Sequence, residues 1–228
     1  MSDERTHALW EDKYQAGHRE RYPWDVVVSF LFRHAPPRPR ADVQVLEVGF
    51  GTANNLWCAA REGFAVSGVE HSATAVEIAR ARFADERLVG DLRCGDFTVL
   101  PFASDQFDLA IDRAAITCAS SADAARAMHE LRRVLRPGGR LLSCLYSSRC
   151  TSATSGTLHA DGRRHDISVG SLTGVGPLRF YTEEDVRQLF AGWTVHQLQH
   201  VERRDVVSAE PVVHAEWVVI AEKPQAIV

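Results

Sequence analysis

The chain has 228 residues, of which 45% are hydrophobic and 25% charged, so it can bury one substantial core. Its 26 basic and 30 acidic side chains give a formal net charge of -4, which offers no broad attraction to phosphate polymers or anionic membranes. This composition excludes collagen and a disordered chain. It also argues against a nucleic-acid partner.

No targeting or membrane-spanning segment is evident in the sequence. The N-terminal run MSDERTHALWEDKYQ is too charged for a signal peptide, and the longest apolar stretches, such as 26–32, are far shorter than a bilayer span. We therefore expect a soluble, cytoplasmic protein with no membrane contact. The cysteines form an odd set without a C-x-x-C pair, so we expect reduced thiols and no metal site. They are Cys58, Cys94, Cys118, Cys144 and Cys150.

Two helices are expected first, at 6–16 and 24–34, and a proline cluster at 36–39 follows them. From residue 43 onward, short apolar runs alternate with amphipathic segments, which is typical of a parallel sheet with crossover helices. The runs predict strands at 43–48, 64–70, 89–94, 107–112 and 140–146. The segments between them predict helices at 53–62, 72–84 and 121–135.

Residues 147–180 interrupt this alternation, because they are rich in Ser, Thr and Gly and have little apolar periodicity. A connection of this length inside a compact domain is either a lid or binding loop, or a disordered surface insertion. Next come a predicted helix at 182–191 and two strand-like segments at 193–203 and 212–221, with a turn near Glu210. Strands this close in sequence pair antiparallel.

A glycine turn, Glu47-Val48-Gly49-Phe50-Gly51, follows the first strand. Glycines allow a tight turn and a close approach of backbone to ligand, although an ordinary strand-to-helix turn would look similar. Glu70 closes the next strand about 20 residues on, where an acid can accept hydrogen bonds from ribose hydroxyls. The carboxylate of Glu47 would repel a pyrophosphate and attract ammonium and sulfonium charges. The turn therefore favours a cationic nucleoside over NAD.

The run from about 43 to 145 resembles the class I S-adenosylmethionine-dependent methyltransferases in five elements that occur in order. They are the E-x-G-x-G loop at 47–51, the strand-end acid Glu70, the turn Gly95-Asp96-Phe97, the strand 107–112, and the segment Leu135-Arg136-Pro137-Gly138-Gly139-Arg140. The resemblance covers most of residues 43–222. It implies one α/β domain over 1–228, with a Rossmann-like seven-stranded sheet that is mostly parallel and has an antiparallel last strand.

The resemblance implies a methionine and ribose site at the first two strands. Glu47 and the backbone of Gly49 and Gly51 would hold the methionine part of S-adenosyl-L-methionine, and Glu70 would hold its ribose.

The adenine and sulfonium sites are implied in the same way. His71 would lie against the adenine, Asp96 would accept its amino group, and Phe97 would supply an amide or an apolar contact. Asp112, at the end of the fourth strand, would lie near the sulfonium and the methyl being transferred, and it or Tyr146 is the next candidate for the base after the insertion histidines. Asp96 could instead only cap a turn, and Asp112 could be a strand-end acid paired with Arg113.

Two segments are expected to enclose the acceptor. In many small family members the helices before the first strand cover the cofactor, so residues 1–40 are expected to form a helical lid. Tyr14 and Trp24 are the preferred cofactor-side aromatics, unless they only pack the helices onto the sheet. Residues 147–180 are the expected recognition insertion. His165 or His159 within it is the candidate general base, since histidine titrates near neutrality, although lone loop histidines are often only solvated.

The resemblance implies methyl transfer from S-adenosyl-L-methionine, which leaves S-adenosyl-L-homocysteine, to a small-molecule acceptor. O-methylation of a hydroxylated metabolite or sugar is favoured. The alternatives are an RNA- or protein-modifying methyltransferase, aminobutyryl transfer or cyclisation on the same cofactor, and a non-catalytic binding subunit. The sequence leaves open the acceptor's identity, oxygen versus nitrogen as its nucleophile, and the oligomeric state.

Overall fold

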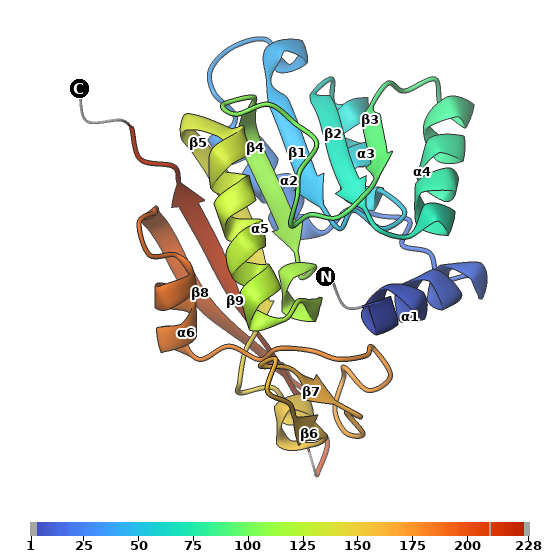
Figure 1. The fold of residues 1–228 in the computed structure, drawn as a ribbon, viewed down its shortest axis with the longest axis vertical. Coiled ribbons are helices and arrows are strands. Elements are labelled where there is room, and N and C mark those ends of the chain that lie inside the picture. Colours follow the sequence, from blue (N-terminus) through green and yellow to red (C-terminus); the bar gives the residue numbers. More distant parts are fainter. Residues whose placement is uncertain (1–3, 210, 226–228) are drawn as a thin grey trace.

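Seven strands form the central sheet, in the order β3-β2-β1-β4-β5-β9-β8 (Figure 1). The computed structural model describes residues 4–209 and 211–225. The strands of the sheet are β1 Gln44–Val48, β2 Ala65–Glu70, β3 Asp91–Cys94, β4 Phe107–Arg113, β5 Leu135–Tyr146, β8 Thr194–Arg204 and β9 Val213–Glu222. The helices are α1 Glu4–Gln15, α2 Asp25–His34, α3 Asn54–Arg61, α4 Ala73–Asp85, α5 Ser121–Val134 and α6 Glu183–Leu189.

The predicted mostly parallel sheet is confirmed. β1 pairs in parallel with β2 and β4, β2 with β3, and β4 with β5. β9 runs antiparallel to both β5 and β8. The carboxyl ends of the parallel strands therefore meet at one edge of the sheet, where open α/β sheets bind their ligands.

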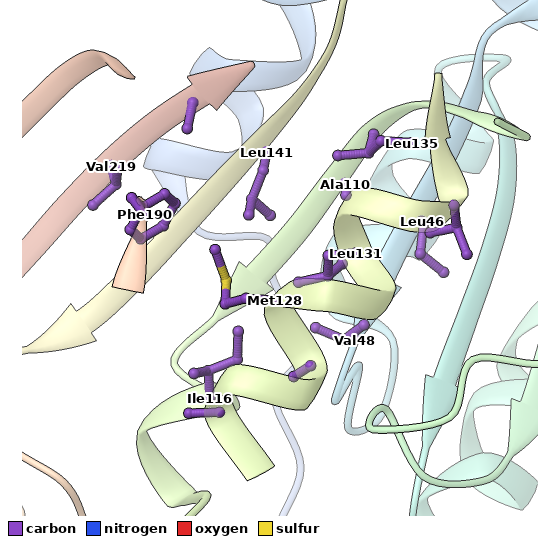
Figure 2. Close-up of a cluster of buried hydrophobic side chains, with 14 of the residues drawn as sticks. Leu46, Val48, Ala110, Ile116, Met128, Leu131, Leu135, Leu141, Phe190 and Val219 are labelled. Atoms are coloured by element: carbon purple, nitrogen blue, oxygen red, sulfur yellow. The ribbon is translucent and has the colours of Figure 1, made fainter. Parts of the chain in front are cut away.

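Helices cover both faces of the sheet. On one face, Met128 and Leu131 of α5 and Phe190, which directly follows α6, pack with Leu141 and Val219 of the sheet (Figure 2). On the other face, α2, α3 and α4 pack on the sheet in a second cluster of buried side chains. The elements that end at the carboxyl edge are thus fixed by two apolar layers.

The two N-terminal helices have different positions. α2 buries Val27, Phe30 and Leu31 against the sheet residues Val45 and Leu109, so it belongs to a covering layer rather than to a lid. α1 lies beyond the carboxyl edge, beside α4 (Figure 1). Of these two helices, α1 therefore has the position expected of a lid.

β5 begins earlier than predicted. α5 ends at Val134, and Leu135 already pairs with Phe107, so the strand starts at residue 135 instead of 140. The register shifts between Phe107 and Leu109, which accommodates the Pro-Gly-Gly run in β5. Gly139 is needed there, because a Cβ would lie 2.9 Å from the carbonyl oxygen of Arg136.

The insertion 147–180 is folded. It contains a short 3-10 helix, η3 Thr151–Thr154, and a hairpin of β6 Thr157–Leu158 with β7 Arg164–His165. Ile167, Leu172 and Leu178 are buried with Cys150 and Ala215 in a third apolar cluster. The alternative of a disordered surface insertion is therefore wrong. The predicted turn at Glu210 lies outside the described residues.

The described helices include none that is both long enough and apolar enough to span a bilayer.

Asp108 joins three segments beneath the amino end of β4. Its carboxylate accepts hydrogen bonds from Arg38 and Arg136 and from the backbone amide of Gln44, the last at 2.8 Å. We expect Asp108→Ala to lower the free energy of unfolding by about 2 kcal/mol, because two guanidinium groups and an amide lose a charged acceptor. Urea denaturation measures this. Asp85→Ala, at an exposed helix end, is the matched control, and an equal small effect of both changes would contradict the prediction.

Candidate functional site

A cavity of about 420 Å³ lies at the carboxyl edge of the sheet. Its walls come from α1, the glycine turn after β1, the loops after β2, β3 and β4, the end of β5, the insertion, and strands β8 and β9. It is therefore built from nearly every segment that reaches this edge.

The glycine turn is crowded on both sides. Gly49 and Gly51 have φ values of +62° and +56°, in the left-handed region that favours glycine. A Cβ on Gly49 would lie 2.4 Å from the Cβ of Ala115, and one on Gly51 would lie 2.7 Å from the hydroxyl of Tyr14. The two glycines thus let the loop after β4 and helix α1 close on the turn.

Glu47 is buried at the start of this turn, with 2% of its surface exposed, and it lines the cavity. Its Oε1 accepts a hydrogen bond of 2.7 Å from the Asn55 amide, while Oε2 has no hydrogen-bond partner among the described residues. Burial raises the pKa of Glu47 to about 8. A cationic donor in the cavity would satisfy the unpartnered oxygen and favour the ionised form.

Glu70 ties the end of β2 to the glycine turn. Its Oε2 accepts a hydrogen bond from the Gly51 amide at 2.9 Å, and its Oε1 accepts one from the Ser72 amide at 2.8 Å. Burial raises the pKa of this carboxyl group. Each oxygen keeps a further acceptor position for hydroxyl donors in the cavity.

The residues predicted at the adenine end line the same cavity. Asp96 accepts a hydrogen bond of 2.8 Å from the Thr98 amide, and Phe97 is partly buried beside it. The His71 ring stacks on the His7 ring of α1, with 3.3 Å between centroids. The structure brings these residues together with Glu47 and Glu70, and their contacts with a cofactor stay predictions.

Tyr14 and Trp24 both line the cavity. Tyr14 is 7% exposed, and burial raises the pKa of its phenol. The Trp24 indole donates a 3.0 Å hydrogen bond to Glu20, and its ring lies 4.1 Å from the Arg113 guanidinium carbon. Trp24 immediately precedes α2, so it reaches the cavity even though that helix packs on the sheet.

Asp112 does not line the cavity, contrary to the prediction. It is fully buried, and it accepts hydrogen bonds from the amides of Ala115 and Ile116 and, at 2.6 Å, from the hydroxyl of Ser143. Burial raises its pKa to about 6. The alternative ion pair with Arg113 is also wrong, because Arg113 lies 3.3 Å from Glu216 and forms its ion pair there. Asp112 instead holds the backbone of the loop that forms one wall.

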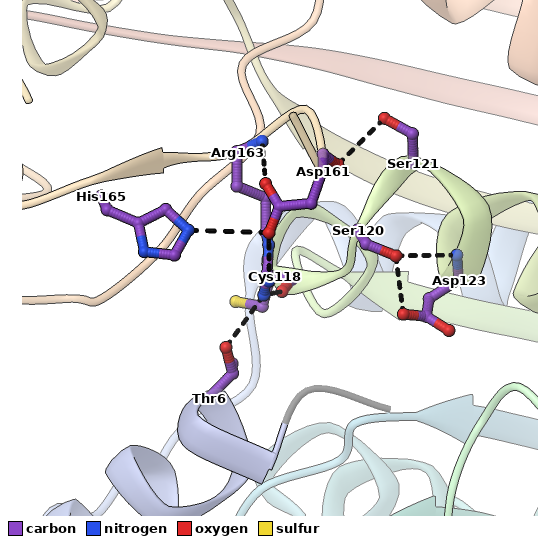
Figure 3. Close-up of polar contacts among 8 residues, drawn as sticks. All are labelled: Thr6, Cys118, Ser120, Ser121, Asp123, Asp161, Arg163 and His165. Carbon is purple, nitrogen blue, oxygen red and sulfur yellow. Dashed lines mark hydrogen bonds and ion pairs between the residues drawn. The ribbon is translucent and has the colours of Figure 1, made fainter. Parts of the chain in front are cut away.

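His159 and His165 also lie away from the cavity walls, so the structure does not support them as bases. Their rings stack with 3.9 Å between centroids, and the Nε2 of His165 lies 3.6 Å from Asp161 (Figure 3). The β6–β7 pairing places both rings at the hairpin. The short hairpin, which the sequence did not predict, is the reason for the difference.

The insertion reaches the cavity through Arg163 and Val175 instead. Arg163 is 3% exposed and donates hydrogen bonds to Asp161, to the Thr6 hydroxyl of α1 and to the carbonyl of Cys118 (Figure 3). The ammonium of Lys13 donates a 2.6 Å hydrogen bond to the carbonyl of Val175. These contacts tie α1 and the insertion together over the cavity.

Several cavity residues were missed from the sequence. Glu20 and His18 follow α1, Arg113 ends β4, and Arg203 and His214 lie on β8 and β9. Arg203 and His214 are register partners, which no local motif could indicate. For Arg113 the signal was its position at the carboxyl end of a parallel strand.

No group of three or more His, Cys, Asp or Glu side chains is placed to hold a metal ion within residues 4–209 and 211–225.

Residues 45–139 match the family described as a methyltransferase domain. A demethylmenaquinone methyltransferase from Clavibacter sepedonicus is 31% identical over 125 residues, which are 52% of this chain and 48% of that protein. A second relative, the methyltransferase GfsG from Streptomyces halstedii, is 38% identical over 43% of this chain and 36% of its own length. The chain thus spans about half, or less, of the curated relatives it matches.

The fold is similar to a solved SAM-dependent methyltransferase from Methanosarcina mazei, with a TM-score of 0.68, 18% identity, and coverage of 89% of this chain and 99% of that one. A chain from a study of the conversion of a disulfide bond into a thioacetal group during echinomycin biosynthesis covers 97% of this chain and 93% of its own, with a TM-score of 0.71 and 21% identity. These likenesses concern the fold. Together with the matched methyltransferase domain, they support the resemblance to the class I S-adenosylmethionine-dependent methyltransferases.

Proposed function

We propose that the protein transfers a methyl group from S-adenosyl-L-methionine to a hydroxyl group of a small metabolite. The observation that carries the cofactor assignment is the buried Glu47 carboxyl group, whose unpartnered oxygen adjoins a glycine turn in the cavity. An ammonium group can donate a hydrogen bond to such an oxygen and favour its ionised form, whereas a pyrophosphate has no proton to donate to it. The match of residues 45–139 to a methyltransferase domain supports the same cofactor.

The described residues fit this cofactor along its length. Glu47 would hold the ammonium of its methionine part, and the backbone of Gly49 and Gly51, which lines the cavity, would lie against it. Glu70 would accept hydrogen bonds from the ribose hydroxyls while it remains bonded to the turn. Asp96 and Phe97 would enclose the adenine. When bound, S-adenosyl-L-methionine supplies an electrophilic methyl group on a sulfonium.

The protein contributes orientation and exclusion of water. Helix α1 and the insertion are joined by the Arg163–Thr6 and Lys13–Val175 hydrogen bonds, which close one side of the cavity. Methyl transfer by in-line displacement needs two aligned reactants more than it needs covalent help from the enzyme. A small acceptor enclosed by these segments fits that requirement better than a macromolecule does.

Proton removal from the acceptor is assigned to His214. Its Nδ1 lies 2.8 Å from the Ser171 hydroxyl, its ring lines the cavity, and burial lowers its pKa below the ordinary value of 6.5. The ring is therefore neutral near pH 7 and can accept a proton. Tyr146, whose ring centroid is 5.7 Å away, is not a base, because burial raises the pKa of its hydroxyl.

A second candidate function is a reaction other than simple methyl transfer on the same cofactor, such as aminobutyryl transfer or cyclisation. It is favoured by the fold likeness to the chain studied for conversion of a disulfide bond into a thioacetal group. Mass spectrometry of the product distinguishes the two functions, since a simple methyl transfer adds one methyl group and yields S-adenosyl-L-homocysteine.

Glu70→Ala is expected to weaken binding of S-adenosyl-L-homocysteine by about 1.5 to 3 kcal/mol, because hydrogen bonds to a charged acceptor are lost. Isothermal titration calorimetry measures this, with circular dichroism as the check of folding. Glu77→Ala, at an exposed position of α4, is the control that should bind like wild type. Unchanged affinity of Glu70→Ala, or tighter binding of NAD by the wild type, would falsify the cofactor assignment.

Cofactor affinity is expected to rise with pH between about pH 6 and about pH 7.5, below the range in which an α-amino group loses its proton. In the free protein Glu47 is protonated below its pKa of about 8, so binding of an ammonium group releases that proton. Glu47→Gln has no proton to release, and its pH dependence should be flatter. Dissociation constants measured across this range test the difference. Parallel slopes for the two proteins would be inconsistent with an ammonium at Glu47.

His214→Gln is expected to lower turnover by about 10²- to 10⁴-fold, the usual contribution of a positioned base. The assay uses an acceptor identified by screening a metabolite library with isotopically labelled S-adenosyl-L-methionine. Affinity for S-adenosyl-L-homocysteine should stay unchanged. His196→Gln, on the partly exposed outer part of β8, is the matched control. Less than a tenfold loss in His214→Gln would mean that the base is another group, or that the acceptor is a nitrogen.

A further inference from the structure

We propose that the acceptor carries an anionic group, and that Arg113 and Arg203 bind it on the β4–β8 side of the cavity. This inference rests on the proposed function and names the substrate class of the same site. Both arginines line the cavity. They come from the end of β4 and from β8, on the other side of β1 from the ribose-binding acid at the end of β2.

One buried carboxylate holds both arginines. Nη2 of Arg113 lies 3.3 Å from Oε2 of Glu216, and Nη1 of Arg203 lies 3.2 Å from Oε1 of the same side chain. Glu216 is 3% exposed and is not among the residues that line the cavity. Two guanidinium groups therefore share one carboxylate, which leaves this three-residue cluster with a net charge of +1 toward the cavity.

Arg113 has an unused donor. Its side chain is 8% exposed, and its Nε is buried without a hydrogen-bond partner among the described residues. The guanidinium carbon lies 4.1 Å from the centroid of the Trp24 ring, which holds the group at the cavity wall. A buried donor without an acceptor is costly, so an anionic oxygen at this position would remove that cost. The planar guanidinium suits a carboxylate or phosphate group.

The surrounding groups favour the same ligand. Tyr146 keeps its hydroxyl proton, because burial raises its pKa, and it can donate a hydrogen bond. His214 is neutral near pH 7 and adds no negative charge. Glu20 lines the cavity and interacts electrostatically with both Arg113 and Glu47. Its carboxylate accepts hydrogen bonds from Trp24 and from Asn54 of α3, so part of its negative charge is already met by donors.

A pair of arginines serving only to neutralise Glu216 does not account for these features. One guanidinium would balance one carboxylate, and Arg203 is 58% exposed at its side chain, so its ion pair alone contributes little to folding. What the second arginine does add is positive charge at the cavity. An acceptor with a flat apolar body can pack on Trp24, which is 37% exposed, while its anionic end reaches the arginines.

The test uses benzoate as the anionic probe and benzamide as its neutral counterpart of the same shape, with phenyl phosphate as a second anion. Each is titrated by NMR into protein saturated with S-adenosyl-L-homocysteine. We expect benzoate to bind at least about tenfold more tightly than benzamide, and the comparison with phenyl phosphate shows which anion is preferred.

Arg203→Gln should lose most of the preference for benzoate over benzamide while binding S-adenosyl-L-homocysteine like wild type. Arg204→Gln, the neighbouring and exposed position that does not line the cavity, is the matched control and should keep the preference. Arg113→Lys retains the charge but lacks Nε, so we expect it to weaken benzoate binding. If that variant fails to fold, the comparison of Arg203→Gln with Arg204→Gln still decides the result.

Equal affinities for benzoate and benzamide, no binding of either anion, or a preference that persists in Arg203→Gln would overturn the inference. These outcomes are separable from failure of the proposed function. Absence of S-adenosyl-L-homocysteine binding overturns the proposed function and the inference with it, whereas cofactor binding without an anion preference overturns the inference alone.

Discussion

The site depends on one constraint: the turn after β1 has no room for side chains at Gly49 and Gly51. The first is packed against Ala115 and the second against the hydroxyl of Tyr14. Because the turn is so tightly enclosed, the backbone amide of Gly51 is fixed where Glu70 can accept its hydrogen bond. The loop after β4, helix α1 and the end of β2 are thereby positioned relative to one another through two residues.

Glu47, at the start of the same turn, is buried, and its burial has a consequence for stability. Its pKa in the folded protein is about 8, above the ordinary 4.5, so between these values the folded state holds a proton that the unfolded state has lost. By linkage, the contribution of Glu47 to stability falls as the pH rises through this range. A residue that does not ionise would make the folded protein more stable at this position. The buried acid is consistent with a site selected for binding a cation rather than for stability.

The sequence predicted the parts of the site that follow strands in local motifs. Glu47, the glycines and Glu70 lie next to apolar runs whose ends could be recognised, and parallel strands bring such ends together. Asp112 was misassigned, because a strand-end acid can point either to the ligand or to its own loop. Its carboxylate accepts hydrogen bonds from the backbone amides of residues 115 and 116 in that loop.

The histidines show the other limit of prediction. His159 and His165 were chosen by residue type within a long insertion. The hairpin that places them outside the cavity lining has strands of only two residues each, which are too short to predict from the sequence. His214 and Arg203 reach the cavity only through the long-range pairing of β8 with β9 and of β9 with β5. Such positions depend on register and on sheet order, which a single sequence does not specify well.

The resulting cavity has two electrostatic halves. Glu47, Glu70 and Glu20 lie toward the glycine turn, whereas Arg113 and Arg203 lie toward β4 and β8. A cofactor that is positive at its ammonium and sulfonium reduces the negative charge of the first half. It would also add positive charge close to the second, because the proposed methyl transfer requires the sulfonium to face the acceptor. The attraction for an anionic acceptor is therefore greater after the cofactor has bound than before. This coupling requires no movement of the chain, and it favours an order of binding in which the cofactor enters first.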